Sequence, residues 1–329
     1  MAWPEAPIIP PTFMPSDASW HWGFFAAAFA SRPRLWLLEY AQRHDIRELE
    51  LGCGGYPGSH HCPSRALLAH PRALSHWRQQ FRQAGVTPRV LSCHGNPLHP
   101  DPALARAHTA ALRRAILLAA ELEIETVVTF SGVAGAQEPG GHSQLNWPVL
   151  SWPYEQSDYW HRVWHEQLIP YWQPMTAFAK QQGVRIALEL HGGFLVHSPG
   201  TLLALRQACG PTLGANLDPS HFWWQGMDPV RAVALLGEAL FHVHLKDWQA
   251  DAQQQAMWGL LDPRDERLTA RSWRYCLPGQ GHDAEFWRAF LQALQQVGYQ
   301  GMLSLEHEDA EWPAESSIAP TLAWLHALL

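Results

Sequence analysis

The stretch GANLDPSHFWWQ, residues 214–225, joins the end of a strand to two side chains that can bind a metal. Residues 212–217 form an apolar, strand-like run that leads directly into Asp218. Pro219 ends that run because proline has no N–H to give to a strand ladder. A carboxylate at the end of a strand, followed closely by an imidazole such as His221, is typical of the carboxyl edge of a parallel sheet. The alternative is that Asp218 only caps the next turn.

The rest of the chain alternates strand-like and helix-like segments around this stretch. Helices are indicated by Pro or Asp near their starts and by Gly beyond their ends. The predicted strands are 20–29, 46–52, 89–94, 125–130, 184–191, 212–218, 240–246 and 301–306. The predicted helices are 31–44, 63–83, 101–123, 158–182 (broken or kinked at Pro170 or Pro174), 201–208, 229–236, 284–297 and 317–328. Residues 132–153 and 248–281 are expected to be loop-like or irregular.

Regular alternation of this kind predicts an α/β fold with a parallel sheet. Eight strand–helix units in a chain of 329 residues are the number and size expected for a (β/α)8 TIM barrel. A doubly wound open sheet is the alternative. Residues 1–19 are rich in proline and are expected to form an irregular N-terminal arm, and no linker divides 20–329, which we expect to be one barrel domain.

Composition excludes several other classes of function. The net charge is −7 and no Lys/Arg stripe stands out, which argues against a nucleic-acid partner. No apolar run approaches the ~18 residues of a membrane span, and the N-terminus has no signal-peptide pattern. Five scattered cysteines suit a reducing cytoplasm rather than a disulfide framework, and the group Cys53, His60, His61 and Cys62 matches no standard zinc spacing.

Polar side chains of one parity recur at the ends of the predicted strands. Because side chains alternate across a strand, residues two apart share a face. Apolar residues occupy the opposite parity in each case, so the polar sets are expected to face the barrel interior. These sets are Glu48 with Glu50, Ser92 with His94, Glu189 with His191, Asn216 with Asp218, His242 with His244 and Lys246, and Ser304 with Glu306 and Glu308.

Burying Glu189, Asp218 and Glu306 together without a partner would cost several kcal/mol for each carboxylate. A divalent cation resolves that conflict. Three carboxylates and the imidazole of His244 form an oxygen-rich site suited first to Mn²⁺, and also to Mg²⁺, Co²⁺ or Zn²⁺. The alternative is a chance set of rim carboxylates in salt bridges with Arg185, Lys246 or Arg274.

Five segments carry a family resemblance: SCHGNPLHPD on the third predicted strand, and ALELH, NLDPSHFWWQG, HVHLKD and LSLEHED on four later, successive strands. In this order they resemble the xylose-isomerase-like TIM barrels of the sugar phosphate isomerase/epimerase superfamily, over about residues 34–329, and the first segment resembles a bacterial branch. The resemblance places metal ligands on Glu189, Asp218, His244 and Glu306, the set reached above. Three departures are Gly192 where proline is expected, Leu245 where alanine is commoner, and Cys276 where the branch tends to have an arginine-type residue.

Such a site implies a metal-dependent isomerase or epimerase acting on a keto or aldo sugar. A cation would stabilise an enediolate while Glu189 or Glu306 removes a proton next to the carbonyl and the other returns it. Structural roles remain open for each histidine, and packing remains open for the tryptophans. No Gly-rich phosphate cradle is present, which favours a non-phosphorylated sugar. The expected substrate contacts are His94, Asn96, His191, His221, Trp223, Lys246 and Arg274.

Three other functions are compatible with parts of this pattern. The same enediolate could expel a leaving group, which would make the protein a lyase, either a keto-inositol-type dehydratase or a 3-keto-glycoside-cleaving subunit with a smaller partner chain. Asp218 and His221 also resemble the DxxH of zinc endonucleases, but no D-x-H follows between 248 and 281. A non-catalytic metal-binding protein is the third. Barrels of this kind often pair, so a homodimer or homotetramer is expected.

Overall fold

Eight parallel strands close into a barrel in this computed structural model, which describes residues 20–329 except 139 and 265–269. The predicted N-terminal arm, 1–19, lies outside the described residues. Neighbouring strands follow the order β1-β12-β9-β8-β7-β4-β3-β2. The barrel strands are β1 (His21–Phe25), β2 (Glu48–Gly52), β3 (Thr87–Ser92), β4 (Thr126–Thr129), β7 (Arg185–Glu189), β8 (Leu213–Leu217), β9 (Leu240–Leu245) and β12 (Met302–Leu305).

β1 closes the barrel by pairing on both edges. His21 lies opposite Met302 of β12, and Gly23 lies opposite Glu48 of β2. The predicted fold class is therefore confirmed, as is the first strand, which continues into a 3₁₀ turn (Ala26–Phe29) rather than extending to residue 29 as a strand. Because all eight strands are parallel, their carboxyl ends meet at one rim.

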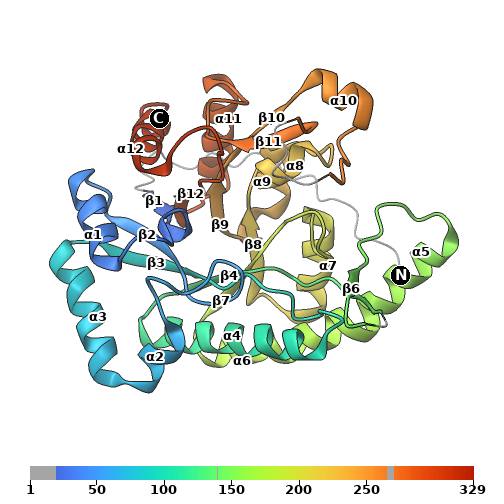
Figure 1. Cartoon of the computed structure of the whole chain (residues 1–329), viewed down its shortest axis with the longest axis horizontal. Coiled ribbons are helices and arrows are strands. Elements are labelled where there is room, and N and C mark those ends of the chain that lie inside the picture. The colour runs from blue at the N-terminus through green and yellow to red at the C-terminus, as the bar shows by residue number, and fades with distance from the viewer. Residues whose placement is uncertain (1–19, 139, 265–269) are drawn as a thin grey trace.

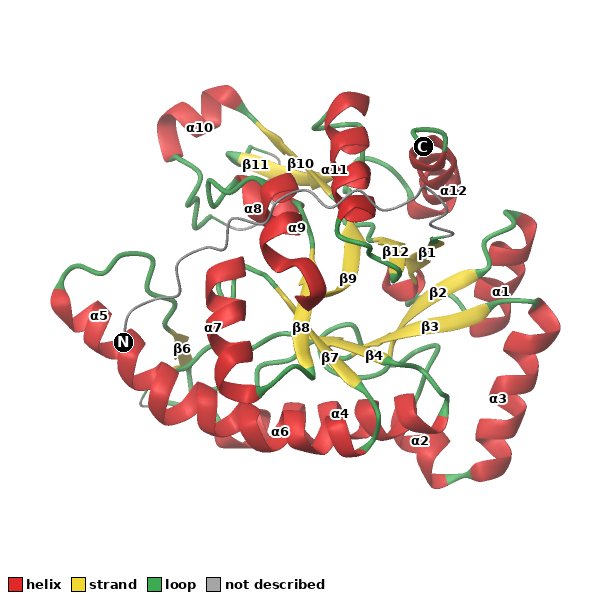
Figure 2. Cartoon of the chain, turned by 180° about the vertical axis from the view of Figure 1, so that it is seen from behind, coloured by secondary structure: helices red, strands yellow, loops and turns green. Residues whose placement is uncertain are grey.

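Helices surround the strands on the outside of the barrel, as Figures 1 and 2 show from opposite sides. Several of these helices have a side-chain cap at the N-terminus. Asp101, Asp228 and Asp283 each accept a hydrogen bond from a backbone N–H of the first turn. The helices are α1 (Arg34–Arg43), α2 (Ser64–Ala69), α3 (Pro71–Ala84), α4 (Pro102–Glu121), α5 (Tyr154–Val163), α6 (Ile169–Gln181), α7 (Pro199–Cys209), α8 (Ser220–Trp223), α9 (Pro229–Leu236), α10 (Ala252–Trp258), α11 (Ala284–Gln296) and α12 (Ala314–His326). None of these described helices is both long and apolar enough to cross a membrane.

Apolar packing occurs on both sides of the strands. A large cluster between strands and helices includes Ile186, Leu188 and Leu190, the apolar parity of β7. A smaller cluster fills the barrel interior and comprises Val90, Val128, Ala187, Phe241 and Met302. The parity argument thus assigned the outward face of β7 correctly.

Two predicted helices are divided in the structure. The helix expected over 63–83 is α2 followed by α3, because Pro71 cannot donate a backbone hydrogen bond and disfavours helical backbone at His70. The helix expected over 158–182 begins earlier, at Tyr154, and contains a π-helical turn (Trp164–Leu168) before α6. That turn lies just ahead of Pro170, which removes one helical hydrogen bond, so the predicted irregularity falls one turn earlier than expected.

The segment 248–281 is not irregular throughout, and that prediction was wrong. β10 (Asp247–Ala250) and β11 (Trp273–Cys276) form an antiparallel hairpin, with α10 between them. A second short hairpin, β5 (Gly135–Gln137) with β6 (Ser143–Leu145), lies inside the loop predicted over 132–153. Both hairpins have weak local signals because their strands are three or four residues long.

Candidate functional site

A pocket of about 350 Å³ opens at the carboxyl rim of the barrel. One part of its wall is apolar and aromatic, and the other part is polar and ionisable. The apolar part consists of Phe25, Ala27, Ala28, Tyr56, Pro57 and Phe130, and the polar part of His94, Glu189, His191, His221, Lys246, Glu306, His307 and Glu308.

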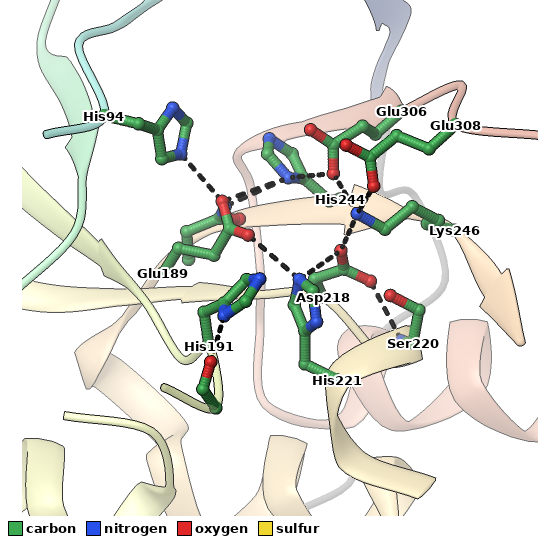
Figure 3. A network of polar contacts seen from close by, with 12 residues as sticks. His94, Glu189, His191, Asp218, Ser220, His221, His244, Lys246, Glu306 and Glu308 are labelled. Carbon is green, nitrogen blue, oxygen red and sulfur yellow. Dashed lines mark hydrogen bonds and ion pairs between the residues drawn. The ribbon is translucent and has the colours of Figure 1, made fainter. Parts of the chain in front are cut away.

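Four side chains predicted as metal ligands converge beside this pocket, and two of them, Glu189 and Glu306, also line it. Glu189, Asp218, His244 and Glu306 each contribute one donor atom, and all four atoms lie within 4.8 Å of one another. They come from the ends of β7, β8, β9 and β12, which are consecutive around the barrel. His244 Nδ1 lies 3.2 Å from Glu306 Oε2 and 3.6 Å from Glu189 Oε2 (Figure 3).

Asp218 is held by its own chain beyond the end of β8. Its Oδ1 accepts a hydrogen bond from Ser220 N at 2.9 Å, which leaves Oδ2 facing the centre of the cluster. Asp218 is fully buried, and burial raises the pKa of its carboxyl to about 7, with the charge of Lys246 acting in the opposite direction. An ionised Asp218 therefore depends on a positive charge close by.

Lys246 supplies such a charge at the base of the pocket. Its Nζ lies 3.0 Å from Asp218 Oδ2, 2.7 Å from Glu306 Oε2 and 2.8 Å from Glu308 Oε2. Burial would lower the pKa of this amine, but the three carboxylates hold it well above its usual value. The ammonium group thus lies beside the predicted metal ligands, and it also lines the pocket.

Glu189 has hydrogen-bond partners on both of its oxygens. His94 Nε2 donates to Oε2 at 2.7 Å, and His221 Nε2 donates to Oε1 at 3.1 Å (Figure 3). Burial would raise the pKa of this carboxyl, but His94 and His221 hold it well below its ordinary value. Glu189 therefore remains a charged group at the pocket wall.

Two more histidine contacts extend the network toward the rim. The rings of His191 and His221 lie 3.9 Å apart between centroids, and burial lowers the pKa of both imidazoles. Tyr275, on β11, places its hydroxyl 3.0 Å from His221 Nδ1. No local pattern indicates Tyr275, because the strand that carries it is only four residues long.

Glu50 is a second residue of the site that was not among the predicted site residues, and it is completely buried. It lies on β2 and bonds to His242 Nε2 at 2.9 Å and to His244 Nε2 at 3.0 Å. Ser92 Oγ donates to the same carboxylate. The parity pattern had placed Glu50 and His242 on the interior face, but it could not show that they meet.

Three residues predicted as substrate contacts do not line the pocket. Asn96 contacts the loop that follows β4, where its Nδ2 donates to Val133 O at 2.8 Å. Trp223 stacks on His282 at 3.9 Å between ring centroids. Arg274 pairs with Asp309 at 3.4 Å and with Glu311 at 2.9 Å. The remaining predicted contacts, His94, His191, His221 and Lys246, all line it.

The departure at Gly192 has a local reason. A Cβ at this position would lie 2.0 Å from the Trp224 ring, so the indole occupies the space of a side chain. Trp224 in turn stacks on Trp273 of β11 at 5.6 Å between centroids. The glycine therefore lets the β10–β11 hairpin pack against the end of β7. Leu245 and Cys276 are both buried, and nothing in their surroundings explains these two departures.

The donor set fits a divalent cation. Burial would lower the pKa of His244, but Glu50 and Glu306 hold it well above its ordinary value, so without an ion Nδ1 carries a proton that faces Glu306 at 3.2 Å. A cation would take the place of that proton between the imidazole and the carboxylates. Three carboxylates with one imidazole are an oxygen-rich set suited to Mn²⁺ or Mg²⁺. Glu189, Asp218, His244 and Glu306 are the residues that would hold the ion.

Fold and site together define a (β/α)8 barrel with a ligand-bearing carboxyl rim. Residues 38–328 match the family described as xylose isomerase-like TIM barrel, and the chain belongs to this family. The chain is 35% identical over 285 residues to the uncharacterized protein YfiH of Bacillus subtilis, covering 86% of this chain and 90% of YfiH.

Two solved structures have a similar fold at low identity. The 3-keto-D-glucoside 4-epimerase YcjR of E. coli aligns with a TM-score of 0.64 at 15% identity, covering 94% of this chain and 100% of YcjR. AsbF of Bacillus anthracis, a probable 3-DHS dehydratase, aligns with a TM-score of 0.62 at 16% identity, covering 93% of this chain and 98% of AsbF. At these identities the comparison establishes the shared barrel.

Proposed function

We propose that this protein is a divalent-metal-dependent isomerase or epimerase that acts on a keto or aldo sugar. The observation that carries the proposal is the convergence of Glu189, Asp218, His244 and Glu306, two of which line a pocket at the rim. Membership in the xylose isomerase-like family and a common fold with a keto-glucoside epimerase support it. Mn²⁺ is the cation that this donor set favours first.

Proton transfer is assigned to the two glutamates that line the pocket. When bound, the cation would act as a Lewis acid that stabilises negative charge on the sugar oxygens. Glu189 and Glu306 each present an oxygen to the pocket, so one can remove the proton next to the carbonyl and the other can return it. Glu189 is kept ionised by its histidine partners, as a base requires.

The neighbouring groups would bind and orient the sugar. His94, His191, His221 and Lys246 line the polar wall and would hydrogen-bond hydroxyl groups. Phe25, Tyr56 and Phe130 would cover the apolar face of the ring.

The charge of the wall favours a non-phosphorylated sugar. Among the described residues that line the pocket there is no arginine, and Lys246 is already paired with three carboxylates. A phosphate group would therefore meet net negative charge.

The decisive experiment combines metal replacement with isotope exchange. The chelated protein should be inactive toward a panel of keto sugars, and Mn²⁺ should restore activity. Sugar recovered from D₂O should carry deuterium at the reacting carbon. Turnover that survives chelation, or isomerisation without deuterium uptake, would contradict the proposed proton transfer.

The same experiment distinguishes the lyase alternative, since elimination would release water or an aglycone. Metal binding with no turnover across the panel would leave a non-catalytic metal protein.

A further inference from the structure

Glu50 contacts His244, a proposed metal ligand, so the role inferred for Glu50 rests on the metal centre of the proposed function. Glu50 lies on β2, whereas His244 lies on β9, and in the barrel order β1 and β12 separate these two strands. The carboxylate therefore reaches across the interior rather than to a neighbouring strand. Glu50, His242 and His244 are all completely buried, so water does not compete for these contacts.

The contacts of Glu50 determine which nitrogen of His244 can bind a metal. His244 Nε2 lies 3.0 Å and 3.1 Å from the two oxygens of Glu50. Because an ionised carboxylate only accepts hydrogen bonds, this nitrogen must carry a proton. The opposite nitrogen, Nδ1, faces Glu306, Glu189 and the side-chain amide of Asn216, so it is the nitrogen that a metal held by these carboxylates would meet.

The ring plane of His244 is fixed by a separate contact. Phe25 stacks on it with 5.8 Å between ring centroids and 22° between planes. Stacking restricts tilt but does not distinguish the two ring nitrogens. The hydrogen bond to Glu50 supplies that distinction.

His242 makes the carboxylate difficult to replace. Its Nε2 donates to Glu50 Oε2 at 2.9 Å, while among the described residues its Nδ1 has no hydrogen-bond partner. A proton on Nδ1 of His242 would be a buried donor without an acceptor, which is unfavourable. Glu50 therefore accepts from both imidazoles, and from Ser92 as well.

We propose that Glu50 is a positioning residue that holds the proton of His244 on Nε2, so that Nδ1 is presented to the metal. Glu50 is not itself a ligand, and it does not touch the substrate pocket. Such carboxylate–histidine–metal arrangements orient the ligand and raise its basicity, and losing the outer carboxylate typically weakens metal binding about 10–100-fold.

Glu50→Gln is the sharpest substitution because it keeps the shape and changes the hydrogen bonding. Glutamine has one acceptor oxygen and one NH₂ donor. His244 Nε2 lies 3.0 Å and 3.1 Å from the two oxygens of Glu50, so either orientation of the amide sets its NH₂ group against the protonated Nε2 of His244. Relief of that conflict at His244 moves the proton to Nδ1, which opposes metal binding there.

The matched control is Glu48→Gln, two residues earlier on the same face of β2. Glu48 pairs with Arg89 at 2.7 Å and with His21 at 3.1 Å, away from the metal ligands. This variant removes a partly buried carboxylate from the same strand and leaves the contacts of His244 intact.

The experiment titrates Mn²⁺ into chelator-stripped protein by isothermal calorimetry, without any substrate. We expect Glu50→Gln to raise the Kd for Mn²⁺ about 10–100-fold and Glu48→Gln to leave it unchanged. Equal Kd values for Glu50→Gln and the wild type would overturn the inference while leaving the proposed function intact. A wild type that binds no Mn²⁺ would overturn both.

A second measurement on the unsubstituted protein covers the case in which Glu50→Gln does not fold. In Zn²⁺-loaded protein labelled with ¹⁵N-histidine, His244 should show a protonated Nε2 and a metal-bound Nδ1. A proton on Nδ1 or a metal bound through Nε2 would refute the assignment.

Discussion

The barrel interior contains two layers with opposite character. In the lower layer, Val90, Ala187 and Met302 belong to an apolar cluster that also includes Val128 and Phe241. Two residues further along the same strands, the upper layer has Ser92, Glu189 and Ser304, which lie with the buried carboxylates and imidazoles. The two layers share the same strands and the same face of each strand, so they differ only in the chemical character of their side chains.

The comparison indicates how stability and function are divided. Apolar side chains in the lower layer gain free energy by leaving water, whereas buried charges in the upper layer cost free energy unless they are paired. A fold selected only for stability would fill both layers with apolar groups. The upper layer is therefore the part of the interior where binding and catalysis are expected, and each prediction below tests this division.

The largest effect is expected from Glu189→Gln, which removes a candidate proton-transfer group. General acid–base catalysis typically contributes about 10²–10⁴-fold, so kcat should fall by at least that factor, because the substitution also removes a proposed metal ligand. Steady-state kinetics on the responsive sugar would measure it. A variant with wild-type kcat would remove Glu189 from the mechanism.

Phe241→Ala tests the lower layer. Phe241 is almost fully buried, and truncating such a side chain costs about 3–5 kcal/mol in the free energy of unfolding. Denaturant unfolding should show that loss, whereas the Kd for Mn²⁺ should stay close to the wild-type value. Weaker Mn²⁺ binding at unchanged stability would indicate that the two layers are not separate in function.

Metal binding should stabilise the protein through the upper layer. At a free Mn²⁺ concentration of one hundred times Kd, linkage adds about 2.7 kcal/mol to the free energy of unfolding. Thermal unfolding with and without Mn²⁺ measures this gain, and Asp218→Asn should reduce it. An identical Mn²⁺-dependent shift in Asp218→Asn would exclude that carboxylate as a ligand.

A methyl group at Gly192 tests how the hairpin supports the upper layer. A Cβ there would lie 2.0 Å from Trp224, and overpacking of this kind costs about 1–3 kcal/mol. We expect Gly192→Ala to be destabilised by that amount in denaturant unfolding and to raise KM, because the hairpin also carries Tyr275. Unchanged KM would mean that the hairpin position does not influence the pocket.

The smallest effect on KM is expected from Arg274→Gln, since its guanidinium pairs with Asp309 and Glu311 and does not line the pocket. The pair with the exposed Glu311 contributes about 0–1 kcal/mol. The buried Asp309 keeps three backbone N–H donors, so stability should fall only modestly and KM should not rise. A clear increase in KM would instead support the substrate contact predicted from the sequence.

Much of the fold could be predicted because its signals are local. The predicted strand 184–191 alternates apolar residues with others and ends in ionisable side chains. The structure places β7 within that range. The split at Pro71 and the β10–β11 hairpin were missed. In the first case, α2 and α3 follow each other so closely that their helical patterns read as one helix. In the second case, strands of four residues are too short to show the alternation of side chains that marks a strand.

The sequence by itself determined the alternation of strands and helices, the parity of each strand and the four donor positions at the strand ends. Those properties depend on side-chain periodicity within a few residues. Only the tertiary structure decided that Glu50 reaches His244 across the barrel, that Tyr275 approaches His221, and that Arg274 pairs with Glu311. These contacts depend on how the closed barrel brings distant strands together, a geometry that no local pattern encodes.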